Sequence, residues 1–463
     1  MSSYDVRLWS ILTRSGKRRA TYAVRWFVNG RPFSKTFATK ALAESYRSKL
    51  VIAQREGVAF DEASGLPEPM ARELNSRTWL EHAIAFVDMK WPRASAKHRK
   101  SIAEALTTVT PVFISSTRGA PSDKRIRAAL NGWAFNKGRR DSESIPQDVQ
   151  DTLRWLTANT VKLSELSDAA LVRKALDTLA LRLDGKAAAA TTVARKRAVL
   201  FGALKYAVEL RLLDTHPMTY VSWTPPRQNE EVDRRVVVNP KQARGLLAAV
   251  REIAPDMEAF FGCMYYAALR PEECLHLRAA DFERPAQDGG WGWLNLNGAT
   301  VTVGAEWSDD GSRTEDRALK HRLRAATRRV PVPPPLVALL ARHLQTYGTS
   351  PDGRLFVTRR GAGGRYLPTR GRSLSNNAYT RVWRKARQMA FSKAQEASPL
   401  ARVPYHLRHA AVSLWLNAGV PAPQVAEWAG HSVHVLMKVY AKCVDGQEEA
   451  VRHRVEAALG PTG

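Results

Sequence analysis

The pattern of apolar residues changes twice along the chain, and these changes constrain the fold more than any other feature of the sequence. Within residues 4–37, three segments are rich in β-branched and aromatic residues, which is typical of strands. Residues 72–222 instead repeat apolar side chains at helical spacing, and residues 236–463 combine both patterns. A chain of 463 residues is also too long for one ordinary hydrophobic core. The sequence therefore predicts a multidomain protein.

We predict three domains from these changes. Residues 1–60 are expected to form a small three-stranded β-sheet plus a helix, with Asn29–Gly30 closing a hairpin because both residues tolerate positive φ. Residues 72–222 are expected to form an all-α domain. Residues 236–463 are expected to form an α+β, mostly helical domain, in which a second turn at Asn297–Gly298 lies within a hairpin region.

The chain carries a large excess of positive charge. It has 71 lysines and arginines against 44 aspartates and glutamates, which gives a formal net charge of +27. Such a charge repels itself, and a polyanionic partner relieves that repulsion. Nucleic acid is the expected partner, because Lys and Arg contacts to phosphates release counterions and supply most sequence-independent affinity. The alternative is an arginine-rich surface that serves only solubility.

The cysteines and the N-terminal sequence indicate a compartment. Cys263, Cys274 and Cys443 form no CxxC pair, which argues against a disulfide framework or a structural zinc site. Residues 1–20 lack the apolar segment of a signal peptide, and no uncharged run approaches the length of a membrane span. We expect a cytoplasmic, nucleoid-associated protein.

Several common catalytic motifs are absent from the sequence. It contains no GxxxxGK[ST] loop, no GxGxxG after a strand and no HExxH, so nucleotide-driven and zinc chemistry lack support. A metal-dependent nuclease would need clustered carboxylates. The apolar runs of the C-terminal half are accompanied by Arg and His rather than by paired Asp and Glu. We therefore expect no cofactor and no metal.

Two segments in the middle of the predicted third domain carry residues suited to phosphate chemistry. In "ALRPEE", Glu273 follows Arg270 by about one helical turn, so the carboxylate can orient the guanidinium. The alternative is an ordinary intrahelical ion pair. Further on, Lys320 is the only lysine between residues 241 and 385, in a region that otherwise uses arginine. A lysine can lose its proton to a leaving group, which an arginine cannot readily do.

Two later segments complete a family resemblance. "PYHLRHA" contains Arg408, and "AGHSVHVLMKVY" contains His431 and, nine residues later, Tyr440. Taken in order with Arg270 and Lys320, these segments resemble the tyrosine recombinase (phage integrase) family, and within it the actinobacterial type of site-specific integrase. The resemblance covers the whole predicted third domain. By the same resemblance, the first domain is similar to an arm-type DNA-binding module and the second to a core-binding domain.

The resemblance implies a role for each residue. Tyr440 would attack the scissile phosphate and form a 3′-phosphotyrosine, which stores the phosphodiester energy without ATP. Arg270 and Arg408 would clamp the non-bridging oxygens, and His431 would donate a further hydrogen bond to the phosphate. Lys320 would protonate the leaving 5′-oxygen.

The sequence departs from the family pattern near Arg408. The family usually has His three residues before this arginine, whereas this chain has Tyr405. A phenol can donate a hydrogen bond to a phosphate, but an ordinary pKa near 10 makes it a poor general base unless neighbouring cations depress that pKa. His409, like Glu273, is expected to support the site rather than carry a proton. Ala268 occupies a position where many members have Gly.

The implied function is site-specific DNA recombination that integrates or excises a mobile element. Double-stranded attachment sites, a homotetramer in the synaptic complex and an excision factor are the partners that the resemblance implies. Two alternatives remain: a non-catalytic DNA-binding regulator and a type IB topoisomerase-like enzyme. A helix-turn-helix within residues 410–430 would suit the regulator, but it leaves His431, Tyr440 and Lys320 unexplained.

Overall fold

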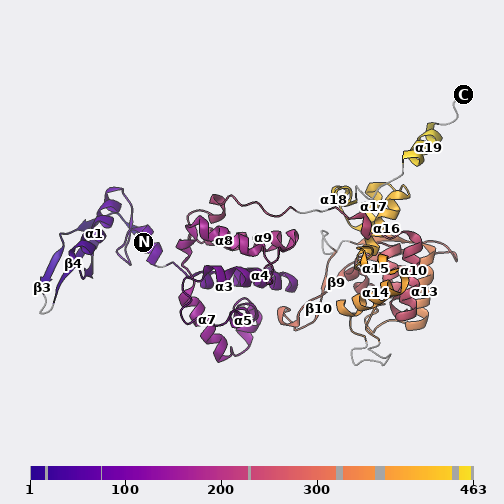
Figure 1. Ribbon diagram of the computed structural model, residues 1–463, viewed down its shortest axis with the longest axis horizontal. Helices are drawn as coiled ribbons and strands as arrows, with labels where there is room; N and C mark the ends of the chain where they lie inside the picture. Colours follow the sequence, from indigo (N-terminus) through magenta and orange to yellow (C-terminus); the bar gives the residue numbers. More distant parts are fainter. Residues whose placement is uncertain are drawn as a thin grey trace. The chain divides into compact units, whose positions relative to one another are not determined.

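The computed structural model describes residues 2–15, 19–74, 76–227, 231–319, 327–359, 371–440 and 448–459. The chain divides into two compact units, Met1–Arg227 and Gln228–Gly463 (Figure 1). The fold class is as predicted: a small sheet with one helix, then a region of helices, then a mostly helical region with short strands. No helix in the described part of the chain combines the length and apolar character that a membrane crossing requires.

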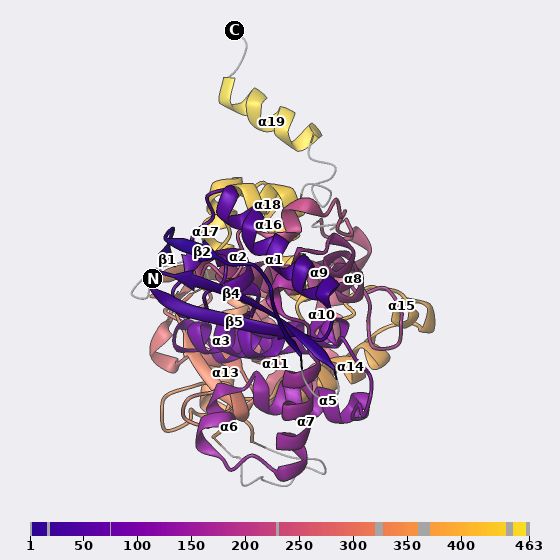
Figure 2. The same cartoon turned by 90° about the vertical axis from the view of Figure 1, so that its left-hand side faces the viewer.

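The N-terminal sheet has four antiparallel strands, one more than predicted. They are β2 (Val6–Leu8), β3 (Leu12–Ser15), β4 (Ala20–Val28) and β5 (Arg31–Phe37), and β4 pairs with the other three. The extra strand is β3, which begins at the end of the first predicted segment and extends into the basic stretch expected to form a turn; β2 and β3 pair with opposite ends of β4. Figure 2 shows β4 and β5 as the long strands. Outside this sheet, β1 (Ser2–Ser3) pairs with β6 (Phe60–Asp61).

One face of this sheet packs on helix α1 (Lys40–Arg55), which begins after the N-cap Thr39. Alternate residues of β4, namely Val24, Trp26 and Val28, are buried in the same cluster as Leu50 of α1. Because side chains alternate along a strand, the residues between them lie on the opposite face. The first unit therefore has one apolar and one open sheet face.

The rest of the first unit is helical. Its helices are α2 (Glu68–Leu74), α3 (Trp79–Lys90), α4 (Ala96–Val109), α5 (Asp123–Ala129), α6 (Lys137–Ser142), α7 (Gln147–Asn159), α8 (Ala169–Leu179) and α9 (Ala190–Glu209). Helix α3 starts at a capping box in which Thr78 and Glu81 satisfy each other's backbone N–H groups. Trp79 is buried, and its indole N–H donates to the Thr110 hydroxyl at 2.9 Å.

The second unit contains ten α-helices among its described residues. They are α10 (Pro240–Ile253), α11 (Glu258–Tyr266), α12 (Pro271–His276), α13 (Pro334–Tyr347), α14 (Asn376–Ala390), α15 (Lys393–Ala397), α16 (His406–Asn417), α17 (Ala422–Ala429), α18 (Val433–Tyr440) and α19 (Glu448–Leu459). A large apolar cluster surrounds Phe260 and Trp383. A smaller one joins α16, α17 and α18 and includes Tyr440.

The strands of the second unit form two small antiparallel sheets. One has the order β7 (Phe282–Glu283), β8 (Gly292–Leu296), β11 (Arg328–Val332), and the other pairs β9 (Ala299–Thr302) with β10 (Thr314–Arg317). Strand β11 also packs against α17. This contact brings the first residue of β11 close to the loop that follows α17.

The two Asn-Gly pairs behave differently. Asn29–Gly30 closes the hairpin between β4 and β5, with φ of 46° and 75°, as predicted. The prediction of a hairpin turn at Asn297–Gly298 is wrong, because β8 and β9 on either side of it belong to different sheets. Gly298 is instead required for close packing: a Cβ there would lie 2.7 Å from His276 Nε2 and 2.9 Å from the Arg317 carbonyl.

Candidate active site

Arg270 immediately precedes α12 and is held on two sides. Its Nη1 donates to Glu273 Oε1 at 2.8 Å, and its Nη2 donates to the carbonyl oxygen of Gly430 at 2.9 Å. The Arg270 backbone N–H also donates to Glu273 Oε2 at 2.8 Å. The pair is therefore not an exposed helical ion pair, because the two side chains are only 13% and 2% exposed.

A second arginine, Arg328 at the start of β11, completes this cluster. It donates from Nη1 and Nη2 to the two oxygens of Glu273 at 2.9 and 2.8 Å, and it is also 2% exposed. Burial alone would raise the pKa of Glu273, but the charges of Arg328 and Arg270 outweigh burial and hold it well below its usual range. One carboxylate thus neutralises one of two guanidinium groups and leaves a net positive charge for an anion.

The sequence reasoning missed Arg328. It lies 55 residues from Glu273, and its own segment, "RRVPVP", reads only as a strand. The neighbouring Arg329 points to solvent and pairs with Glu283, so the sequence alone does not distinguish the two arginines. The only available signal is strand alternation, which places Arg328 on the same face as Val330 and Val332.

Arg408 is fully buried in α16. Its guanidinium donates to the backbone carbonyls of Ala268 and Ala429 and contacts His431 Nε2 at 2.9 Å. Burial, and then the charge of Arg270, lower the pKa of Arg408. Ala268 has a φ of 50°, in the left-handed region that favours glycine, at the position where the sequence departs from the family's Gly.

Tyr440 is the last residue of α18, and its side chain is enclosed. It is 1% exposed, and its hydroxyl oxygen lies 2.8 Å from Nδ1 of His409. The ring of His431 stacks on the Tyr440 ring, with centroids 6.0 Å apart and planes at 30°. Tyr440 therefore contacts one imidazole through its hydroxyl and a second through its ring.

Both of these histidines are neutral at ordinary pH. Burial lowers the pKa of His409 to about 3, assisted by His406 and Arg408. Burial also lowers the pKa of His431 to about 3, assisted by Arg408 and Arg270. Neither imidazole adds charge to the site, so its positive charge comes from the arginines.

Tyr405 lies between the arginines and His409. Its ring contacts the His409 ring in a T-shaped arrangement, with centroids 5.1 Å apart. Burial lowers the pKa of Arg270, but interactions with Glu273 and Tyr405 together outweigh burial and raise it. The Tyr405 side chain is half-buried, so it is more open than Tyr440.

Seven of the eight site residues expected from the sequence are linked by these contacts. They are Arg270, Glu273, Tyr405, Arg408, His409, His431 and Tyr440. The eighth, Lys320, lies outside the described residues. Leu319, immediately before it, is buried in the large cluster, and β10 ends two residues earlier.

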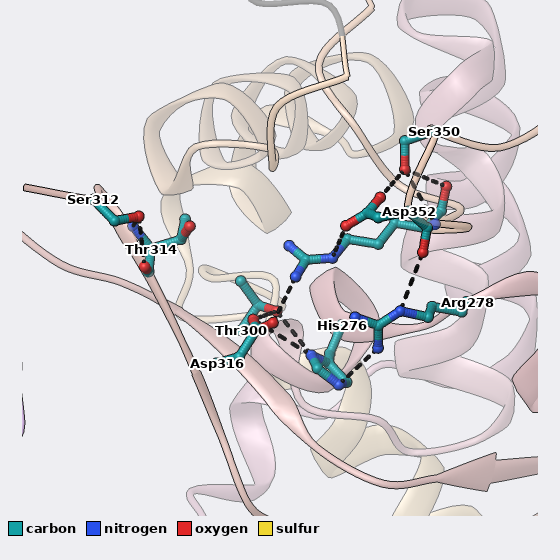
Figure 3. A network of polar contacts seen from close by, with 9 residues as sticks. His276, Arg278, Thr300, Ser312, Thr314, Asp316, Ser350 and Asp352 are labelled. Carbon is teal, nitrogen blue, oxygen red and sulfur yellow. Dashed lines mark hydrogen bonds and ion pairs between the residues drawn. The ribbon is translucent and has the colours of Figure 1, made fainter. Parts of the chain in front are cut away.

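Strand β10, which leads to Lys320, is fastened to the body of the second unit by a polar network (Figure 3). Asp316 accepts from Thr300 Oγ1 at 2.6 Å and from Arg354 Nη2 at 2.7 Å. His276, at the end of α12, contacts the same Thr300 hydroxyl through Nδ1 at 3.0 Å, and Arg278 Nη1 contacts His276 Nε2 at 3.0 Å. The network ties β10 to the helix that carries Glu273.

Within the part of the chain that the structure describes, no group of three or more His, Cys, Asp or Glu side chains could hold a metal ion. The carboxylate at the centre of the site, Glu273, is already bound by two arginines.

Comparison with known proteins gives structural similarity only. No family model matches the sequence, and no curated protein matches it. A fragment of the Tn1549 transposon integrase in complex with a circular intermediate DNA is 13% identical over 70% of this chain and 97% of its own, with a TM-score of 0.46. The XerH site-specific recombinase bound to its difH substrate is 13% identical over 81% and 94%, with a TM-score of 0.43. A lambda integrase tetramer bound to a Holliday junction is 12% identical over 92% and 93%, with a TM-score of 0.45.

Proposed function

We propose that this chain is a site-specific tyrosine recombinase, which cuts and rejoins DNA through a covalent 3′-phosphotyrosine and integrates or excises a mobile element. One observation carries the proposal. The hydroxyl of Tyr440 contacts His409, the ring of Tyr440 stacks on His431, and His431 also contacts the buried guanidinium of Arg408. A nucleophile placed next to bases and permanent cations is the arrangement that attack on a phosphodiester requires.

The chemistry follows from these neighbours. Tyr440 Oη attacks phosphorus, the bond to the 5′-oxygen breaks, and a second 5′-hydroxyl later reverses the step. Arg270 and Arg408 stabilise the negative charge on the non-bridging oxygens, since guanidinium groups stay charged and bind two oxygens at once. Arg328 and Glu273 act indirectly, because they hold Arg270 in place. Lys320 protonates the leaving oxygen.

The site must rearrange before it can bind DNA. Tyr440 and Arg408 are 1% and 0% exposed, so a phosphate cannot touch either side chain as they stand. The guanidinium of Arg408 is already hydrogen-bonded to the carbonyls of Ala268 and Ala429. A phosphate would replace these carbonyl partners with stronger, charge-assisted ones. We propose that a shift of α17 on DNA binding opens the site and leaves the contact between Tyr440 and His409 in place.

DNA is the substrate that the charge distribution favours. The sheet register places Arg7, Arg14 and Arg25 on the open face of the N-terminal sheet, opposite the face that packs on α1. On the same face, Arg25 lies over the Trp9 ring at 5.7 Å, and Trp9 packs on Phe27. An open basic face fits phosphate backbones. We assign arm-type DNA binding to residues 1–60, core binding to 72–222 and catalysis to 236–463.

A covalent-trapping experiment tests this function. The full-length protein is incubated in EDTA with a library of nicked suicide duplexes that carry a randomised core, and adducts resistant to denaturation are recovered and sequenced. Wild type is expected to form adducts on a defined core sequence, and Tyr440→Phe is expected to form none. DNA binding without adducts would instead support a regulator. Relaxation of arbitrary supercoiled plasmid without a partner site would support the topoisomerase-like alternative.

The assembly is tested on the recovered sequence. Recombination needs two sites in one complex, and we propose that four copies of the chain form it. Two duplexes with the selected core should yield exchanged products and a Holliday junction intermediate, and the complex should contain four protein chains by mass photometry. An excision factor would be needed if products form in one direction only.

A further inference from the structure

The hydroxyl of Tyr440 has a specific hydrogen-bond partner, Nδ1 of His409 at 2.8 Å. Building on the proposed function, we propose that His409 is the general base that takes the phenolic proton of Tyr440 during DNA cleavage. The sequence had indicated a supporting role for His409. Tyr405 occupies the position at which a histidine would be expected, and a phenol is a weak base there.

The geometry of α16 gives His409 this role. Successive residues of a helix point about 100° apart, so Arg408 and His409 face different neighbours. Arg408 points to the Ala268 and Ala429 carbonyls, whereas His409 points to the end of α18. Tyr405, four residues earlier on the same side of α16, packs edge-to-face on the His409 ring at 5.1 Å and 74°. This contact holds the imidazole in the orientation that aims Nδ1 at Tyr440.

The imidazole is neutral in the absence of DNA, so its Nδ1 can accept a hydrogen bond from the phenol. Its pKa is lowered to about 3, first by burial and then by His406 and Arg408, so it is unprotonated in the absence of DNA. With the proton on Nε2, Nδ1 accepts from the tyrosine O–H. The ionisable groups that face it are Tyr405, His406 and Arg408 along α16, His431 after α17, and Tyr440. A bound phosphodiester adds a negative charge beside Arg408, which makes His409 more basic when cleavage begins.

The neighbouring groups are less suited to this task. His431 contacts the Arg408 guanidinium through Nε2 at 2.9 Å, so that nitrogen accepts from an arginine N–H. Its ring stacks on the Tyr440 ring and does not point at the hydroxyl. His406 contacts the ring of His409, with centroids 5.9 Å apart, so it faces His409 and not the phenol. His409 is the base aimed at the Tyr440 oxygen.

Each proton that moves during cleavage has a donor and an acceptor in this site. As the bond from Tyr440 Oη to phosphorus forms, the phenolic O–H bond breaks and the proton moves to Nδ1 of His409, which becomes an imidazolium. The bond from phosphorus to the 5′-oxygen breaks, and that oxygen takes a proton from the general acid, which we assign to Lys320. In religation the incoming 5′-hydroxyl forms a bond to phosphorus and gives its proton to the now neutral Lys320, while the phosphotyrosine bond breaks and the imidazolium returns its proton to the tyrosine oxygen.

The test varies the base and the acidity of the nucleophile together. His409→Ala and His409→Asn are made in the full-length protein, each with natural tyrosine or with a ring-fluorinated, more acidic tyrosine at position 440. The readout is the single-turnover rate of adduct formation on the suicide duplex selected as described above. Both variants should be slower by about 10²–10⁴-fold at neutral pH. Fluorination of Tyr440 should restore a large part of the lost rate in both variants, because an acidic phenol needs less help from a base. It should change the rate of the wild-type protein much less.

His409→Asn separates proton transfer from positioning. The amide oxygen can occupy the place of Nδ1 and accept the hydrogen bond, but it cannot take the proton. If His409→Asn cleaves as fast as wild type, or if fluorination changes wild type and both variants by the same factor, His409 is not the base. His434 is an exposed histidine on α18 and serves as the control. His434→Ala should respond to fluorination as wild type does. A wild-type protein that forms no adduct at all would refute the proposed function itself.

Discussion

Arg328 donates both of its Nη groups to the carboxylate of Glu273, at 2.9 and 2.8 Å, and both side chains are 2% exposed. This carboxylate is the same one that orients Arg270. Arg328, on β11, thus helps to fix the position of the Arg270 guanidinium at the start of α12, although Arg328 itself need not touch DNA.

Replacement of Arg328 should damage both stability and cleavage. Arg328→Met leaves Glu273 buried with one partner fewer, and removing one member of a buried ion pair costs about 3–5 kcal/mol. The free energy of unfolding of the second unit should fall by about that amount. Hydrogen exchange of α11 peptides in urea measures this free energy. Adduct formation should also slow, because Arg270 loses its fixed orientation.

Arg329 provides the matched control. It is adjacent on β11, but its ion pair with Glu283 is about half exposed on both sides, at 53% and 52%. Arg329→Met should therefore cost less than about 1 kcal/mol. Equal effects of the two substitutions would contradict the role assigned to Arg328.

Gly430 should not tolerate any side chain. It ends α17 with a φ of 65°, and a Cβ there would lie 2.3 Å from Arg328 Nη1 and 3.3 Å from Arg270 Nη1. Gly430→Ala should displace both arginines and abolish adduct formation while DNA binding persists. Gly311→Ala has a similar φ of 69° but open space around it, so it should cost only about 1–2 kcal/mol of backbone strain and keep cleavage. Normal cleavage by Gly430→Ala would show that the arginines can move at little cost.

The sequence predicts the local part of this site and misses the tertiary part. Arg270 and Glu273 are three residues apart, so their contact follows from helical geometry. The Arg328–Glu273 pair depends on how β11 packs beside α12, and the two arginines of "RRVPVP" look alike in the sequence. The bond between His409 and Tyr440 spans 31 residues and depends on the packing of α16 on α18.

The fold shows the same division. The sheet and helix of residues 1–60 and the helices beyond them follow from apolar periodicity, which is a local signal. The wrong hairpin at Asn297–Gly298 has a physical reason: the dipeptide suits a tight turn. Here the glycine is instead needed because His276 and the Arg317 carbonyl pack against it.

Acid should destabilise the second unit through its buried histidines. Burial lowers the pKa of His343 and of His406 to about 4, and that of His409 and His431 to about 3. Below the unfolded value of about 6.5, the unfolded chain binds protons that the folded unit does not. Stability is therefore fully present above pH ~6.5 and falls as the pH drops toward 4, by about 1.4 kcal/mol per pH unit for each histidine.

His343→Gln isolates one of these protons. His343 lies away from the site and contacts the Leu355 carbonyl through Nε2 at 3.0 Å, a bond that a glutamine amide can also donate. The slope of unfolding free energy between pH 6 and 5, measured by hydrogen exchange in urea, should decrease by about 1.4 kcal/mol per pH unit. The exposed His434→Gln should leave the slope unchanged. An unaltered slope in His343→Gln would mean that this histidine is protonated in the folded unit.

The polar network around Asp316 should matter for the leaving group and not for the nucleophile. Asp316 binds Thr300 and Arg354 and so fixes the strand that leads to Lys320. Lys320→Ala should slow cleavage of a normal 5′-oxygen duplex by about 10²–10⁴-fold, the range expected for loss of a general acid. A duplex with a bridging 5′-sulfur should be cleaved at nearly the wild-type rate, because a thiolate leaves without a proton.

Asp316→Ala should also slow cleavage of the 5′-oxygen duplex more than that of the 5′-sulfur duplex, but by a smaller factor than Lys320→Ala. The substitution loosens β10 but leaves Lys320 in the chain. Glu315→Ala is the control on the same strand, since among the described residues Glu315 pairs locally, with Arg317 at 2.6 Å. It should cleave both substrates as wild type does. If Asp316→Ala slows the oxygen and sulfur substrates equally, the network supports the fold of the whole site and has no specific effect on the leaving group.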